Sequence, residues 1–175
     1  MESVRAMIRP FSPLSRFGLA VAAATLIADQ ATKFLVLQVM NLSPGVAIPV
    51  TPFLDLSLTY NRGISYGWLA QDSDLGRNVL IAISLAAAGL FVVWLGRTGS
   101  RLVAVALGLL IGGAIGNAVD RAIHGAVVDF VSLHAFGWRW YVFNVADSAI
   151  VAGVVGLLYD AVFGGATKRP PSTGH

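Results

Sequence analysis

The sequence predicts an all-α membrane protein with four transmembrane helices. Hydrophobic residues make up 56% of its 175 positions and charged residues only 12%, and the mean hydropathy is +0.74. Soluble domains carry about twice that charged fraction, so too few polar side chains remain to cover a water-facing surface. Four long apolar stretches indicate where the chain crosses the bilayer.

Each apolar stretch approaches the roughly 20 residues that a helix needs to cross about 30 Å of hydrocarbon. The predicted spans are residues 17–40, 79–95, 102–119 and 143–163. Residues 1–163 are therefore predicted to form a single polytopic membrane domain, and the Gly/Pro-rich residues 164–175 a flexible tail. An alternative makes residues 1–28 a cleaved signal peptide. The apolar character resumes at Phe34, which favours an uncleaved span.

The distribution of lysine and arginine predicts the orientation. Seven of these residues lie beside the spans on one side, and four lie in the loops on the other side. Positive charge is enriched on the cytoplasmic side of membrane proteins, so both termini are predicted to be cytoplasmic and the loops at about 41–78 and 120–142 to lie outside. The seven are Arg5, Arg9, Arg16, Arg97, Arg101, Lys168 and Arg169; the four are Arg62, Arg77, Arg121 and Arg139.

Both outer loops contain strand-like patterns. Apolar and polar residues alternate over 54–60, which is typical of a half-buried strand. Residues 127–133 and 138–142 flank a turn at Ala135-Phe-Gly and predict a hairpin. Trp68, Trp138 and Trp140 are expected near the lipid headgroups, where indole is favoured.

Composition excludes several kinds of site. The chain has no cysteine, which rules out a thiol nucleophile, a disulfide and any cysteine-ligated metal. Its three histidines form no metal-binding motif, so no metal is predicted. The net charge of +3 comes from dispersed residues rather than one basic face, so no nucleic-acid partner is predicted. Serine–lysine proteolysis through Lys33 is not supported by any spacing.

Polar residues inside or beside the spans mark a functional site, because ionisable groups in a membrane are costly. Asp29 and Lys33 stand at i,i+4 in the first span, which permits an ion pair. Asn117, Asp120 and Arg121 share one face of the third span, and Asn144 and Asp147 share one face at the start of the fourth. The third span also carries Gly108, Gly112 and Gly116, whose spacing favours close helix packing.

Asp129 is a lone carboxylate in the apolar run Val127–Phe130, where poor hydration would raise its pKa. If Asp129 faces Asp147, the two could share one proton, as the carboxyl pair of an aspartic protease does. Spacing alone leaves this open. The alternative is that each carboxylate pairs with Arg121, Arg139 or Lys33 in a structural network.

The sequence closely resembles the bacterial lipoprotein signal peptidases, also called type II signal peptidases. Five motifs carry the resemblance, in order, across roughly residues 29–159. They are Asp29-Gln-Ala-Thr-Lys33, Tyr60-Asn-Arg-Gly-Ile-Ser-Tyr-Gly67, Gly116-Asn-Ala-Val-Asp-Arg121, Val127-Val-Asp-Phe130 and Phe143-Asn-Val-Ala-Asp-Ser148.

The resemblance implies four transmembrane helices, a small extracytoplasmic β-sheet and a lid-like loop, in an aspartic endopeptidase that needs no cofactor. Asp129 and Asp147 would be the catalytic pair. Asn61, Gly63, Tyr66 and Arg121 would bind the substrate. Asn117 and Asn144 would brace the aspartates, with Asp29, Lys33 and Asp120 in support. The family usually has Phe where this chain has Tyr66, which affects only the local geometry of the lid.

The resemblance also implies a substrate, a location and an inhibitor. The enzyme would remove the signal peptide from a diacylglyceryl-modified prolipoprotein, cutting N-terminal to the lipidated cysteine. It would act as a monomer in contact with membrane lipids, in the inner membrane near the periplasmic face, and globomycin would inhibit it. Two other classes remain open: a small proton-coupled transporter, with Asp29, Lys33, Asp120 and Asp147 as a relay, and a non-catalytic scaffold.

Overall fold

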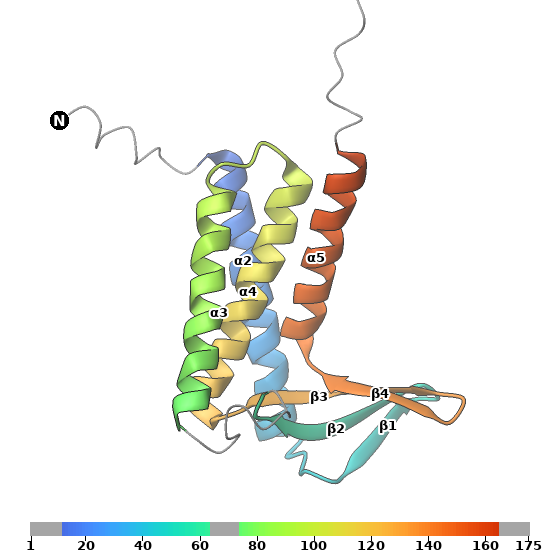
Figure 1. The fold of residues 1–175 in the computed structure, drawn as a ribbon. Coiled ribbons are helices and arrows are strands. Elements are labelled where there is room, and N and C mark those ends of the chain that lie inside the picture. Colours follow the sequence, from blue (N-terminus) through green and yellow to red (C-terminus); the bar gives the residue numbers. More distant parts are fainter. Residues whose placement is uncertain (1–11, 64–73, 165–175) are drawn as a thin grey trace, which may run out of the picture.

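Four helices run side by side in the computed structural model, which describes residues 12–63 and 74–164 (Figure 1). They are α2 (Pro13–Phe34), continued by a π-helical turn η1 (Leu35–Val39), α3 (Asp74–Leu95), α4 (Arg101–His124) and α5 (Val145–Phe163). All four are long and apolar enough to cross a membrane. The predicted four-helix membrane fold is confirmed.

The helices begin and end at capping residues rather than at the limits of the apolar stretches. The Ser12 Oγ accepts a hydrogen bond from the backbone N–H of Ser15 at 3.1 Å, and Pro13 follows at the first helical position, so α2 starts before residue 17. Gly125 ends α4 with a φ of 74°, a left-handed conformation that favours glycine. Helix α4 therefore extends to His124, beyond the predicted end of the span at residue 119.

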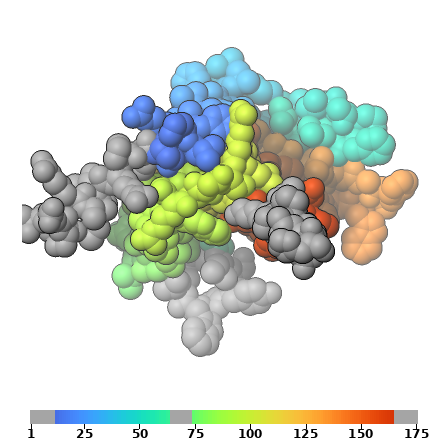
Figure 2. Space-filling view, turned by 90° about the horizontal axis from the view of Figure 1, so that it is seen from above, coloured from blue at the N-terminus to red at the C-terminus, as the bar shows by residue number. Residues whose placement is uncertain are grey.

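Helix α4 is the centre of the bundle, and it contacts α2, α3 and α5. Seen from the end opposite the sheet, its yellow-green terminus lies between α2 and α5 (Figure 2). The glycines of α4 make this possible. A methyl group at Gly112 would lie 2.5 Å from the carbonyl oxygen of Ala22 and 2.7 Å from the Cβ of Thr25, so α2 approaches at backbone distance, as the glycine spacing predicts.

A four-stranded antiparallel sheet lies at one end of the bundle and projects past α5 (Figure 1). Its strands are β1 (Ala47–Thr51), β2 (Leu54–Asn61), β3 (Val127–Ala135) and β4 (Trp138–Phe143), in that spatial order. The strand over 54–60 and the hairpin about residues 135–137 are confirmed. Leu58, Val128 and Phe130 pack with Val36 and Leu42, which attaches the sheet to the end of α2 and η1.

The burial of β2 differs from a simple alternation. Leu58 is buried, but Tyr60 of the same predicted face is exposed and Asp55 of the opposite face is buried. Two features account for this. The pairing of β2 with β3 shifts register between Leu56 and Thr59, and Asp55 lies 3.1 Å from the His134 Nε2 and 3.5 Å from an Arg139 nitrogen. The edge strand β1 is exposed along its whole length, and no alternation of apolar and polar residues predicted it.

The lid-like loop predicted from the family resemblance, with Tyr66 and Trp68, lies outside the described residues. The described chain begins and ends at the same end of the bundle, opposite the sheet (Figure 1).

Candidate active site

Asp129 and Asp147 are brought to the sheet end of α4 by very short connections. Only Gly125 and Ala126 separate α4 from β3, in which Asp129 is the third residue. Only Asn144 separates β4 from α5, and Asp147 lies in the first turn of that helix. The turn at Gly125 and the cap at Asn144 therefore direct both carboxylates to one place.

Asn144 connects the two carboxyl groups. Its Nδ2 donates to the Asp129 Oδ1 at 2.7 Å, and its Oδ1 accepts from the backbone N–H of Asp147 at 2.9 Å. The Asp147 Oδ2 in turn accepts from the backbone N–H of Asn144 at 3.3 Å, which completes a reciprocal N-terminal cap on α5. The residue that starts the helix therefore also holds the carboxylate of the neighbouring strand.

Two further amides complete the hydrogen bonding of the pair. The Asn117 Nδ2 donates to the Asp147 Oδ1 at 2.8 Å, and the Asn117 Oδ1 accepts from Asn144 at 3.2 Å. From β2, the Asn61 Nδ2 donates to the Asp129 Oδ2 at 3.1 Å. Asn117 and Asn144 therefore each contact one of the two carboxyl groups through a side-chain amide, and Asn61 contacts Asp129 as well as facing the groove described below.

The environment of Asp129 raises its pKa so far that a large fraction of the carboxyl group is still protonated at neutral pH. The residue is 1% exposed, and burial raises the pKa of its carboxyl group to about 7, with a further contribution from the charge of Asp147. Hydrogen bonds from Asn61 and Asn144 and the charge of Lys33 oppose this increase. A buried acid beside a second carboxylate is the arrangement in which one proton is shared.

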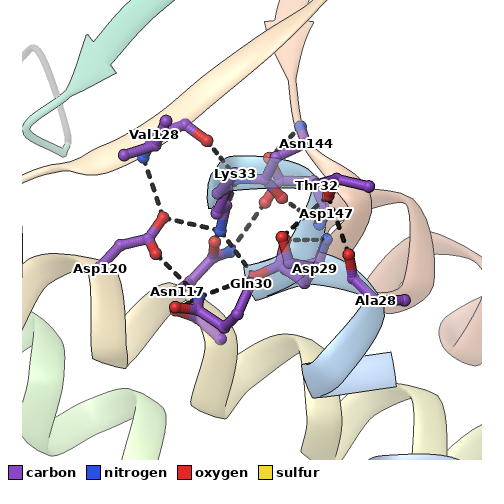
Figure 3. A network of polar contacts seen from close by, with 12 residues as sticks. Ala28, Asp29, Gln30, Thr32, Lys33, Asn117, Asp120, Val128, Asn144 and Asp147 are labelled. Carbon is purple, nitrogen blue, oxygen red and sulfur yellow. Dashed lines mark hydrogen bonds and ion pairs between the residues drawn. The ribbon is translucent and has the colours of Figure 1, made fainter. Parts of the chain in front are cut away.

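Two of the three cations that could have neutralised the pair, Lys33 and Arg139, have other partners. The Lys33 Nζ lies 2.7 Å from Asp29 and 2.7 Å from Asp120, as the i,i+4 spacing predicted for Asp29. Arg139 lies beside Asp55. Asp29, Lys33 and Asp120 are buried and form a cluster with Gln30, next to Asp147 (Figure 3).

Arg121 reaches the same region from the end of α4. One of its terminal nitrogens donates to the Asn117 carbonyl oxygen at 3.2 Å, and its charge attracts Asp147, Asp129 and Asp120. Its Nε is buried and has no hydrogen-bond partner among residues 12–63 and 74–164. A buried donor of this kind is available to a bound molecule.

An open groove of about 410 Å³ reaches Asp129 from the sheet. The end of β2 and the first residues after it form one wall, and β4 forms the other. Gly63 lies in this wall with a φ of 117°, and its N–H donates to the Asn61 Oδ1 at 3.1 Å. The lining residues are Thr59, Tyr60, Asn61, Arg62, Gly63, Asp129, Trp140, Tyr141 and Val142.

The sequence did not predict Gln30, Trp140 or Tyr141 as site residues, and for Trp140 it predicted only a position near the lipid headgroups. Gln30 is an amide within a span, a signal that could have drawn attention to it. The positions of Trp140 and Tyr141 in the groove depend on strand pairing and had no comparable signal. Among the described residues, no group of three His, Cys, Asp or Glu side chains could hold a metal ion.

Comparisons with known proteins agree with one another. A family model described as signal peptidase (SPase) II matches residues 21–163. A lipoprotein signal peptidase of Methylobacterium sp. (strain 4-46) is 52% identical over 157 residues, covering 87% of this chain and 95% of that protein. One of Methylorubrum extorquens (strain PA1) is 53% identical over 158 residues, covering 90% and 91%. A bacterial membrane enzyme solved by the in meso method has a TM-score of 0.75 and 26% identity, covering 90% of this chain and 94% of that one.

Proposed function

The chain belongs to the signal peptidase II family of lipoprotein signal peptidases, a family of membrane proteases, and from this premise we propose a specific reaction and mechanism for it. The substrate is a diacylglyceryl-modified prolipoprotein, and the cleaved bond lies directly N-terminal to the lipidated cysteine. Asp129 and Asp147 are the catalytic pair. The observation that carries this assignment is that Asn144 contacts both carboxyl groups, donating from its side-chain amide to Asp129 and from its backbone N–H to Asp147.

Asp129 is the acid and Asp147 the base. The pKa of Asp129, raised to about 7 by burial and by Asp147, leaves a substantial fraction of this carboxyl group protonated near neutral pH. Asp147 is the second member of the pair, and its two oxygens accept hydrogen bonds from Asn117 and from the backbone N–H of Asn144, which fix the position of its carboxyl group.

The reaction then follows the aspartic protease scheme. Asp147 takes a proton from water while the water oxygen attacks the peptide carbonyl carbon, and Asp129 gives its proton to the carbonyl oxygen. The resulting diol collapses as the C–N bond breaks. Asp147 returns its proton to the departing amine, and a hydroxyl proton returns to Asp129.

The groove between β2 and β4 binds the peptide around the cleaved bond. Its wall at Asn61 and Gly63 lies beside Asp129, and the buried Nε of Arg121 supplies a donor for a substrate carbonyl. Tyr66, outside the described residues, contributes to the same site in this proposal. Globomycin competes for this groove, and one chain is sufficient for catalysis.

The sheet faces the periplasm and both termini face the cytoplasm of a cell whose inner membrane holds the enzyme. Arg97 and Arg101 support this orientation, because Arg97 lies in the link between α3 and α4 and Arg101 is the first residue of α4, at the end of the bundle opposite the sheet. Apolar side chains such as Leu90 and Leu158 are more than half exposed on the helices and face lipid.

A comparison of precursors tests the reaction. Purified protein is incubated with a lipidated and an unlipidated precursor, and products are separated by gel and mass. The lipidated precursor is expected to be cut before its cysteine, and Asp129→Asn and Asp147→Asn are each expected to abolish the cut. Asp160→Asn is the matched control, because Asp160 lies near the other end of α5, where its Oδ1 accepts a hydrogen bond from the Ser100 Oγ at 3.0 Å. Turnover by either site variant would refute the assigned pair.

A proton-coupled transporter is not favoured by the geometry. Asp29, Lys33, Asp120 and Asp147 gather in one cluster at the sheet end of the bundle (Figure 3), whereas a relay would be distributed across the membrane.

A further inference from the structure

Each proposed catalytic aspartate directly follows a residue whose backbone N–H is bound by a buried carboxylate. The backbone N–H of Val128, before Asp129, donates to the Asp120 Oδ2 at 3.0 Å. The backbone N–H of Ala146, before Asp147, donates to the Asp29 Oδ1 at 2.9 Å. Strand β3 and helix α5 are therefore each attached, one residue before the reacting side chain, to a carboxylate of a different helix.

One ammonium group joins these two carboxylates. The Lys33 Nζ lies 2.7 Å from the Asp29 Oδ2 and 2.7 Å from the Asp120 Oδ2 (Figure 3). Gln30 makes a second link, since its Nε2 donates to the Asp29 Oδ2 at 3.1 Å and to the Asp120 Oδ1 at 3.0 Å. A continuous series of hydrogen bonds and ion pairs thus connects the backbone N–H of Val128 to that of Ala146 through Asp120, Lys33 and Asp29.

The cluster is closed to solvent. The side chains of Asp29, Lys33 and Asp120 are 0%, 4% and 1% exposed. Gly116 leaves room for it, because a methyl group there would lie 2.6 Å from the Asp29 Oδ2. Two neighbouring carboxylates in such a site repel each other strongly unless a cation lies between them, so the position of Lys33 determines how far apart they stand.

We propose that Lys33 is a positioning residue for hydrolysis, which sets the separation of Asp129 and Asp147 by holding Asp120 and Asp29, the carboxylates attached to the backbone before each of them. This inference rests on the proposed function. Lys33 is not among the residues that line the groove beside Asp129, so it acts on the catalytic step and not on substrate binding.

Kinetics of Lys33→Met and Lys33→Arg separate positioning from simple support of the fold. Misplacing reacting groups by about 1 Å costs about 100-fold in rate, so Lys33→Met is expected to lower kcat by about that factor. KM is expected to stay within about twofold, because no substrate contact is lost. Lys33→Arg retains a cation that can reach both carboxylates and is expected to recover at least about a tenth of the wild-type kcat.

The rates are expressed per folded molecule, with the folded fraction taken from thermal melting. Arg101→Met is the control for loss of a cation, because Arg101 lies over the Phe17 ring at the far end of the bundle. It is expected to leave kcat and KM unchanged. Folded Lys33→Met with the wild-type kcat, or with a raised KM and unchanged kcat, would overturn the proposal.

If Lys33→Met does not fold, the double variant Lys33→Met/Asp120→Asn decides. It removes one charge of each sign, and the new amide oxygen can still accept the Val128 N–H. The same loss of kcat at constant KM supports positioning, and a wild-type kcat overturns it. Asp129→Asn keeps the two proposals distinct: if that variant is active, the proposed function fails, whereas if it is inactive and Lys33→Met is fully active, only the positioning role fails.

Discussion

Asn144 has two roles at the scale of a single residue. It starts α5 as its N-cap and donates a 2.7 Å hydrogen bond to Asp129. Spacing predicted that Asn144 and Asp147 share a face, because that relation is local. The contact between Asn144 and Asp129 depends on the return of the β3–β4 hairpin, and the sequence does not specify the geometry of that return.

Replacing Asn144 with Ala is expected to affect both stability and turnover. Loss of the cap should cost about 1 kcal/mol of unfolding free energy, and loss of the bridge should lower kcat by about 100-fold through misplaced carboxyl groups. Ser100→Ala is the matched control, since Ser100 caps α4 at the other end of the bundle. It should lose similar stability and retain its kcat. Equal activity of the two variants would contradict the bridging role.

The raised pKa of Asp129 predicts how activity depends on pH. Burial and the charge of Asp147 bring this pKa to about 7, and the mechanism requires the proton. The kcat is therefore expected to fall as pH rises through about 7, when measured on the lipidated precursor in a series of buffers. A constant kcat up to pH 9 or so would exclude Asp129 as the acid.

The same shift predicts a stability effect of definite sign. In the unfolded chain the pKa of Asp129 is about 4. Between about pH 4 and 7 the folded protein therefore binds a proton at Asp129 that the unfolded chain does not, and its stability decreases as pH rises. Asp129→Asn lacks this group. The difference in Tm between the variant and the wild type should therefore increase over that window, in favour of the variant, in melting experiments followed by intrinsic fluorescence.

At the scale of elements, close packing of α2 on α4 positions the carboxylates that these helices contribute. The glycine spacing on α4 predicted close packing, and the structure identifies α2 as the partner at Gly112. The sequence could not name the partner, because GxxxG specifies a close approach but not the helix that makes it. The same limit applies to Gln30 and Asp120, which meet although they are 90 positions apart.

Gly112→Ala is expected to separate α2 from α4. Its methyl group would meet backbone, which cannot rotate away, so overpacking should cost about 1–3 kcal/mol and lower activity. Gly89→Ala on α3 is the control, because a methyl group there has nothing within 4 Å. It should be neutral or slightly stabilising, as alanine is the better helix former. Thermal melting in detergent compares the two, and equal Tm values would contradict the close approach.

At the scale of the whole molecule, strands were predicted from alternation in the outer loops and the sheet from the family resemblance, whereas the four helices were predicted from composition and apolar stretches. They depend on the length and polarity of segments, which are sequence properties. The relation of sheet to bundle was not predictable from pattern. It follows from two very short connections. The left-handed Gly125 sets the direction of the two-residue connection from α4 to β3, and the Asn144 cap sets the direction of the one-residue connection from β4 to α5.

The absence of cysteine allows the orientation to be tested with single introduced thiols. Phe136→Cys places one at the hairpin tip, where Phe136 is 99% exposed, and Gly99→Cys places one in the link between α3 and α4. In spheroplasts, a membrane-impermeant maleimide is expected to label only the first. The second should react after permeabilisation, and the cysteine-free parent not at all. The reverse pattern would invert the proposed topology.

The position of Asp147 on α5 has a consequence for biosynthesis. During translation, α2, α3, α4 and the sheet leave the ribosome first, so a partly made chain holds Asp129 without its partner and without the amide that bridges them. In the proposed mechanism, such a chain can neither activate water nor complete its own carboxyl pair. The nascent enzyme is thus inert towards its neighbours in the membrane, and hydrolytic capacity begins only when α5 has inserted and docked.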